Sequence, residues 1–384
     1  MLDALFAPMS PEAFFKDYWT RNFLHIPGEP NKFSHYFPWT VLNKALEEGR
    51  FDGRRLGLVR AGKPIEASRF LTNSAVDAAG LVNELVAGAT LVFNSCEEVH
   101  RPLRDLCEAL ERLVRKKVVT NLYAGWRKDN GFDTHWDTQD VLILQVAGRK
   151  RWKVWKPTRT HPFRKDHTDP SPATAPLEDP VWDCVLEPGG MLNIPRGWWH
   201  VANPLDEPCL HLTVTIENHN GIDFLKWLAD SMKLSQTARM ELPVVADQAE
   251  RELWLARVKD DLLAAWGPDM IDRFLADQDA VGTARPLLSL PAEANPARNS
   301  VTPDTRLQLA LARPIIAGKV AEGIAACQAG ALKWDADAET AARLLIFNDG
   351  QPHTLAELSS SPDFKVQMAV GFLLLQGVLR RAQA

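Results

Sequence analysis

The spacing of apolar residues predicts helices early in the chain and strands in its middle. Ser10-Pro11-Glu12 is typical of a helix start, aromatic residues at helical spacing continue it over 14–23, and leucines repeat at helical spacing over 102–116. From residue 117, short apolar or alternating runs are separated by Gly, Pro and Asn, which indicates strands. The strands are expected at 89–94, 118–124, 141–146, 150–156, 182–187, 191–195 and 209–217. Short strands without intervening helices favour a sandwich or barrel.

Helical patterns return after residue 221. They cover 224–234, 249–265, 270–276, 338–347, 354–358 and 364–381, with a linker rich in Pro, Ala and Asn near 286–303. The last helices, followed by a weak ribbon, favour a winged-helix-like module. We therefore expect an α+β protein with domains at 1–220, 221–300 and 301–384.

Length and charge limit the classes of partner. At about 150 residues per domain, 384 residues correspond to two or three domains. The 44 basic and 49 acidic residues give a net charge of −5, which argues against a general nucleic-acid coat. Residues 304–384 hold eight basic and eight acidic side chains, so we expect this module to pack or dimerise and direct nucleic-acid binding to be absent.

The sequence also favours a cytoplasmic protein. No apolar run approaches the ~18 residues that a membrane helix needs, and Met1 to Ser10 lack the pattern of a secretory signal. The five cysteines are odd in number and form no CxxC pair, so we expect reduced, buried thiols.

Three residues have the chemistry of an open iron site, which needs two imidazoles and one carboxylate on one octahedral face. His135 and Asp137 are two apart before a strand, so their side chains can point to the same side, and His200 follows a distant turn. A second HxD, His167-Thr168-Asp169, lies in a Pro-rich loop and is the weaker candidate. The alternative is a salt bridge between His135 and Asp137, with His200 as a structural histidine.

Iron sites of this kind usually bind 2-oxoglutarate, whose far carboxylate needs a cation. Lys150 starts a strand after the Gly148 turn, and we expect that strand to form a hairpin with 141–146. Strand alternation puts Lys150 on one face with Trp152, and the rivals Arg149 and Arg151 on the other. Lys153 is the remaining alternative for the cation that binds the far carboxylate. Asn121, Tyr123 and Thr213 can add hydrogen bonds to a buried anion.

These motifs together resemble the JmjC-type cupin oxygenases, and within them the ribosomal-oxygenase group. The resemblance rests on Asn121-Leu-Tyr123, His135-Trp-Asp137, Asp140 to Gln145, Gly148 to Trp152, Ile194-Pro195 with His200, and His211-Leu-Thr213. It implies a double-stranded β-helix (jelly-roll) core, Fe(II) held by His135, Asp137 and His200, and 2-oxoglutarate held by Lys150 with Asn121, Tyr123 and Thr213. It also implies a helical dimerisation region, hence a homodimer, and a C-terminal winged-helix-like domain.

The sequence thus predicts an Fe(II)- and 2-oxoglutarate-dependent dioxygenase that hydroxylates a protein side chain, with a ribosomal protein as the expected substrate. Trp126, Trp136, Trp198 and Trp199 are candidates to line the mouth of the substrate pocket. Two alternatives stay open: the same chemistry on a free peptide or small molecule, and a catalytically silent cupin that binds a ligand or partner.

Overall fold

The computed structural model describes residues 1–49, 51–127, 131–163, 166, 178–282, 290–294, 301–359 and 363–382. They form two compact units, one of Met1–Leu113 with Lys117–Asn218, the other of Val114–Lys116 with His219–Ala384. The three-part division with limits at 220 and 300 stays a prediction.

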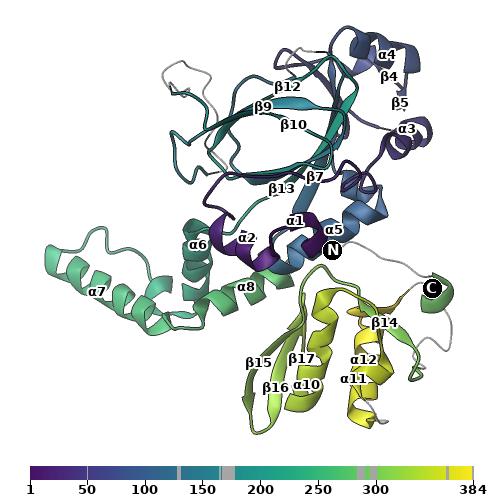
Figure 1. The fold of residues 1–384 in the computed structure, drawn as a ribbon. Coiled ribbons are helices and arrows are strands. Elements are labelled where there is room, and N and C mark those ends of the chain that lie inside the picture. The colour runs from purple at the N-terminus through teal and green to yellow at the C-terminus, as the bar shows by residue number, and fades with distance from the viewer. Residues whose placement is uncertain are drawn as a thin grey trace. The chain divides into compact units, whose positions relative to one another are not determined.

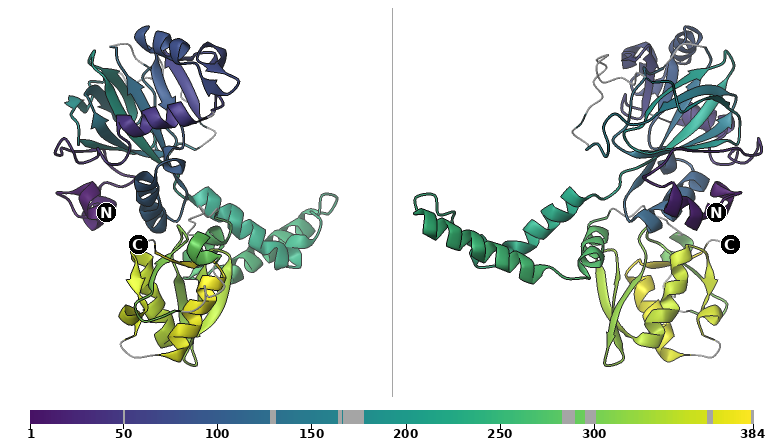
Figure 2. Two further views of the ribbon diagram at one scale, coloured as in Figure 1. Left: turned by 90° about the vertical axis from the view of Figure 1, so that its right-hand side faces the viewer. Right: turned by 60° about the vertical axis from the view of Figure 1, so that its left-hand side comes forward.

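The first unit is built on antiparallel strands. They are β1 Leu24–Ile26, β2 Leu56–Arg60, β3 Lys63–Pro64, β4 Leu71–Thr72, β5 Ala75–Val76, β6 Thr90–Phe93, β7 Val118–Gly125, β8 Asp140–Ala147, β9 Lys150–Trp155, β10 Trp182–Leu186, β11 Met191–Ile194, β12 Trp199–Pro204 and β13 Cys209–Ile216. Eight of them form a sheet in the order β1-β11-β8-β13-β7-β6-β2-β3, and a smaller sheet has the order β10-β9-β12 (Figures 1 and 2). The predicted barrel of short strands is confirmed, and all seven predicted strands are present.

The core of this unit lies between the two sheets. Every residue of β8 except Ala147 is buried, because the strand is central in the larger sheet, between β11 and β13. Val141 and Ile143 pack with Trp152 and Val154 of β9 in one apolar cluster. The inward faces of both sheets thus close over a common interior.

The predicted hairpin between 141–146 and 150–156 is wrong. β8 pairs with β11 and β13, whereas β9 pairs with β10 and β12 in the other sheet. Gly148 makes the crossing, with a left-handed φ of +60°, and a Cβ at this position would lie 2.1 Å from the carbonyl oxygen of Pro208. The chain therefore passes from one sheet to the other at this turn, and β9 begins across the interior from β13.

Helices of the first unit are α1 Leu2–Phe6, α2 Pro11–Asp17, α3 Trp39–Glu48, α4 Ala78–Val86 and α5 Arg101–Val114. Ser10 caps α2 as expected, since its hydroxyl accepts a hydrogen bond from the backbone N–H of Ala13 at 3.2 Å. The helix ends at Asp17, so the helical pattern extended to 23 was too long. The leucine stripe of α5 buries Leu103, Leu106 and Leu110.

The second unit contains helices and a set of strands that the sequence did not predict. Its helices are α6 Gly221–Ser231, α7 Gln248–Ala265, α8 Met270–Ala280, α9 Leu290–Glu293, α10 Ala338–Leu344, α11 Leu355–Leu358 and α12 Phe364–Leu375. Its strands are β14 Arg306–Leu309, β15 Ile316–Ala321, β16 Ile324–Ala329, β17 Leu332–Asp337, β18 His353–Thr354 and β19 Leu379–Arg381. They form the sheets β18-β14-β19 and β15-β16-β17, so the expectation of a purely helical module with a weak ribbon was incomplete.

All five cysteines are free, and four are buried as expected. Cys184 is exposed on β10, which corrects the expectation for that residue. Among the described helices, none is both long and apolar enough to cross a membrane.

Candidate metal and cosubstrate site

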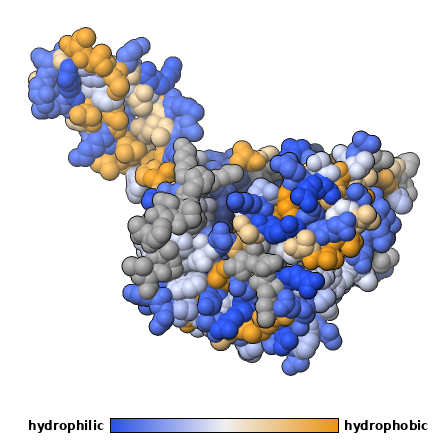
Figure 3. Space-filling model, turned by 90° about the horizontal axis from the view of Figure 1, so that it is seen from above, coloured by the Kyte–Doolittle hydropathy of each residue, from blue (hydrophilic) through white to orange (hydrophobic). Residues whose placement is uncertain are grey.

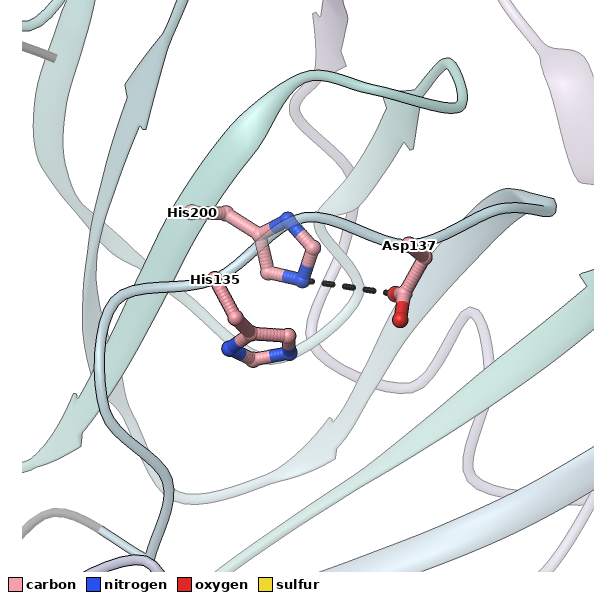
Figure 4. A group of neighbouring side chains, drawn as sticks. All are labelled: His135, Asp137 and His200. Atoms are coloured by element: carbon pink, nitrogen blue, oxygen red, sulfur yellow. Dashed lines mark ion pairs between the residues drawn. The ribbon is translucent and has the colours of Figure 1, made fainter. Parts of the chain in front are cut away.

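His135 and His200 are brought together by a backbone bridge between two distant segments. The N–H of His135 donates to the carbonyl of His200 at 3.1 Å, and the N–H of His200 donates to the carbonyl of His135 at 2.7 Å. In such an antiparallel pair the two side chains emerge on the same face. Their ring centroids are 4.5 Å apart, and Asp137 completes the group with a carboxylate oxygen 3.5 Å from Nε2 of His200 (Figure 4).

Both histidines direct one ring nitrogen toward this group. Nδ1 of His135 lies 2.7 Å from the carbonyl of Asp133, and Nδ1 of His200 lies 3.1 Å from the carbonyl of Trp198. A backbone carbonyl only accepts, so each Nδ1 carries a proton, and Nε2 is the nitrogen left to bind a metal. Burial, followed by the neighbouring His135, lowers the pKa of His200 to about 4, so this ring is neutral near neutral pH. Ligand atoms of the three residues lie within 4.8 Å of one another, a spacing that suits one metal ion.

The turn before His200 is fixed to the Asp137 segment. The N–H of Gly197 donates to the backbone carbonyl of Asp137 at 2.9 Å, and the buried Asp140 accepts from the N–H of Arg196 at 3.1 Å. The segment that carries Asp137 and the turn before His200 are therefore held together by these hydrogen bonds as well as by the bridge. The rival pair His167 and Asp169 lies outside the described residues.

Lys150 lies in the same cavity as these residues. The cavity has a volume of about 290 Å³, and Lys150 is 3% exposed. The rivals point outward into ion pairs, as strand alternation predicted: Arg149 with Glu207 at 3.0 Å, and Arg151 with Asp183 at 2.6 Å. Lys153 also reaches Asp183, at 3.6 Å. Burial lowers the pKa of Lys150. No carboxylate among the described residues pairs with its ammonium group and offsets this effect.

Of the three expected helpers, two line the cavity. Tyr123 and Thr213 are wall residues, and burial, followed by the charge of Asp137, raises the pKa of Tyr123 to about 12, so its hydroxyl remains a donor. Asn121 is not among the described lining residues. Its side-chain oxygen accepts from the N–H of Ser95 at 3.2 Å, and its side chain also hydrogen-bonds the hydroxyl of Tyr123.

Sequence reasoning did not name several residues of the wall, His211 and Trp152 among them. The signal for both was present, because strand alternation put Trp152 with Lys150, and His211 with Thr213. The tryptophans expected at the pocket mouth are not among the described lining residues. Trp136 and Trp199 are buried against each other at 6.5 Å, while Trp126 packs on Trp39 and Trp198 on Phe23.

A JmjC domain model matches residues 97–224, the stretch that carries the bridge, Lys150 and strands β7 to β13. This stretch thus resembles the JmjC-domain cupins of the 2-oxoglutarate oxygenase class. Its relatives within that class include the ribosomal oxygenases.

Two curated relatives illustrate the similarity. Ribosomal oxygenase 2 of Rattus norvegicus is 28% identical over 236 residues, which cover 58% of this chain and 49% of that protein. The bifunctional lysine-specific demethylase and histidyl-hydroxylase NO66 of Drosophila pseudoobscura pseudoobscura is 28% identical over 228 residues, covering 56% of this chain and 22% of that protein. The aligned part is thus between about a fifth and a half of these relatives.

Solved structures extend the likeness in fold to nearly the whole chain. The ribosomal oxygenase YcfD of Escherichia coli, in a complex with cobalt and 2-oxoglutarate, has a TM-score of 0.60 at 16% identity and covers 98% of this chain and 99% of its own. At this identity the comparison supports the fold, a mixed α+β arrangement with a cupin barrel.

Proposed function

We propose that this protein is an Fe(II)- and 2-oxoglutarate-dependent hydroxylase of a protein side chain. One observation carries the proposal: a buried lysine without a carboxylate partner among the described residues shares one cavity with a two-histidine, one-aspartate cluster. A buried cation needs a counter-charge, and a 2-oxo diacid supplies one while its other end reaches the metal.

The donor set fits iron. Two neutral imidazoles and one carboxylate on one side leave the remaining positions of an octahedral ion open, as non-haem Fe(II) oxygenases require. We assign His135, Asp137 and His200 as the ligands. When bound with 2-oxoglutarate and O2, the iron supplies the oxidising chemistry that couples decarboxylation of the oxo acid to hydroxylation of a C–H bond.

The chain's own residues bind and orient the cosubstrate. Lys150 donates to the far carboxylate, and the hydroxyls of Tyr123 and Thr213 are further donors in the same wall. We keep Asn121 as an indirect contributor, because its side chain hydrogen-bonds Tyr123. The apolar side chains of Val141 and Ile143 also line the cavity and limit its water content.

For the substrate we propose a ribosomal protein, because relatives in both comparisons carry ribosomal oxygenase in their names. The test is intact-mass analysis of ribosomal proteins from cells with and without the gene. One ribosomal protein should lose the mass of a single oxygen atom when the gene is absent, and the His135→Ala gene should not restore it. An unchanged set of masses would redirect the search to free peptides and small molecules.

We further propose a homodimer formed through residues 221–300, with 301–384 as the winged-helix-like part. In α7, Leu253, Leu255 and Leu263 are more than half exposed, and no residue of this helix is buried within the chain. Figure 3 shows apolar areas on the surface of the molecule in orange. The alternative raised by the sequence, that these leucines pack on the chain's own barrel, predicts a monomer in solution. A second copy of this chain is the favoured partner, because most soluble oligomers are symmetric assemblies of identical chains.

A further inference from the structure

A hydrogen bond connects the two sheets inside the cavity. Nζ of Lys150, at the start of β9, donates to Nδ1 of His211, in β13 of the larger sheet, at 2.9 Å. Lys150 is 3% exposed and His211 is 5% exposed, and both line the cavity. The ligand cluster proposed above does not use His211.

The imidazole of His211 is held in place by aromatic neighbours. Tyr123, its partner in the strand register, stacks on it at 5.1 Å with an interplanar angle of 10°. Trp152 meets it edge-on at 5.4 Å and 77°. Burial, followed by the charge of Lys150, keeps the pKa of His211 well below its usual value. The ring is therefore a neutral acceptor at a fixed position.

A lysine needs such a fixed acceptor if its charge is to occupy one place. Its four-carbon stem is flexible, whereas an arginine would bring a rigid fork. The ammonium group has three donors, and His211 accepts one of them, which leaves two for a ligand. Since the acceptor stands on the opposite sheet, the bond draws the ammonium across the interior.

We propose that His211 is a positioning residue, which fixes the Lys150 ammonium in the cavity so that it meets the far carboxylate of 2-oxoglutarate. The inference rests on the proposed function. It predicts that His211 acts through Lys150, and only on oxo acids that carry a second carboxylate.

The test uses the full chain loaded with Mn(II) in place of iron, so that ligand binding is measured by calorimetry without turnover. His211→Phe keeps an aromatic ring against Tyr123 but removes the acceptor. We expect its affinity for 2-oxoglutarate to fall at least about 10-fold, the scale of one charge-assisted hydrogen bond. His211→Asn places an oxygen near the position of Nδ1 and should recover most of the affinity. Binding of 2-oxobutyrate, which has no far carboxylate, should be the same in His211→Phe and the wild type.

A double variant separates positioning from a general effect on the cavity. If His211 acts through Lys150, Lys150→Met with His211→Phe should bind 2-oxoglutarate no more weakly than Lys150→Met alone. An additional loss in the double variant, or an equal loss for 2-oxobutyrate, would overturn the inference. So would unchanged 2-oxoglutarate affinity in His211→Phe.

Two further outcomes are distinguishable. A wild-type protein that binds Mn(II) but no 2-oxoglutarate would contradict the proposed function itself. If His211→Phe fails to bind Mn(II), His211→Asn decides: affinity close to that of the wild type supports the positioning role, and a loss as large as that of Lys150→Met contradicts it.

Discussion

Lys150 is the residue on which cosubstrate affinity should depend most. Its ammonium is buried beside the ligand cluster, whereas the neighbouring cations form exposed ion pairs. We expect Lys150→Ala to weaken 2-oxoglutarate binding at least about 10-fold, because a charge-assisted hydrogen bond is lost. Metal binding should change little. Calorimetry on the Mn(II)-loaded protein measures both.

Arg151→Ala is the matched control for Lys150→Ala. It removes a cation from the next position of the same strand, where the side chain pairs with Asp183 outside the cavity. Its 2-oxoglutarate affinity should equal that of the wild type. Equal losses in the two variants would mean that net charge, not the cavity cation, determines binding.

The metal ligands make a second prediction at this scale. His135→Ala or Asp137→Ala should abolish binding of one Fe(II) or Mn(II) per chain, since each removes one of three donors. Titration calorimetry with Mn(II) checks this. The decisive comparison is His200→Ala with His167→Ala: binding that survives the first and vanishes with the second would assign the metal to the other HxD.

His211 should make the metal-free protein sensitive to acid. Its pKa is well below the usual value in the folded chain, first because of burial, so the ring is neutral there, whereas the unfolded chain takes up a proton below about pH 6.5. The unfolded state then binds more protons, so stability is full above that pH and is lost as pH falls below it. The loss per group is at most about 1.4 kcal/mol for each pH unit.

Urea unfolding at about pH 7.5 and about pH 5.5 measures this effect in the wild type and in His211→Asn. The fall in unfolding free energy between the two pH values should be larger in the wild type. An equal fall in both proteins would assign the acid sensitivity to other groups, of which the buried His200 is the first candidate.

At the scale of elements, the Gly148 turn decides which sheet Lys150 joins. With a φ of +60° and the carbonyl oxygen of Pro208 where a Cβ would be, Gly148→Ala strains the backbone and forces a clash. We expect a loss of at least about 2 kcal/mol in unfolding free energy, measured by urea denaturation. Gly57→Ala is the control, because Gly57 lies in the larger sheet and a Cβ there meets nothing within 4 Å. Similar effects in both variants would contradict the role of the turn.

Local patterns were enough to locate seven strands of the first unit and the HxD group, but not β12. They failed where pairing depends on distant partners. The β8–β9 hairpin was expected because the two strands are adjacent in sequence, but each found its partners elsewhere. The hydrogen bond between Lys150 and His211 joins residues 61 apart, and no local period reports such a contact.

The strands of the second unit were not predicted for a different reason. β16 has three alanines among its six residues, and alanine is depleted in strands because it packs little surface. Its place is determined by pairing with both β15 and β17. Tertiary context therefore overrode the local propensity.

β12 of the first unit was also not predicted. The residues of Trp199–Pro204 mix aromatic, polar and turn-forming types, so no alternation was visible.

At the scale of the whole molecule, the exposed leucines of α7 predict assembly. Light scattering should give about twice the 42.9 kDa chain mass. Leu255→Asp should shift the mass toward a single chain, because a charge would be buried at the contact, and Lys259→Ala on the same helix should not. A chain truncated after Glu217 should be monomeric or insoluble. A full-length monomer at micromolar concentration would contradict the dimer and weaken the assignment to the ribosomal oxygenases.

The backbone bridge between His135 and His200 has a consequence for the growing polypeptide. During synthesis the first histidine and Asp137 leave the ribosome well before the strand that holds the third ligand. Until that strand pairs, the nascent chain presents two of the three proposed donors, His135 and Asp137, which lie two positions apart. Two donors make a weak chelator, so we expect metal to be retained only after the barrel has closed.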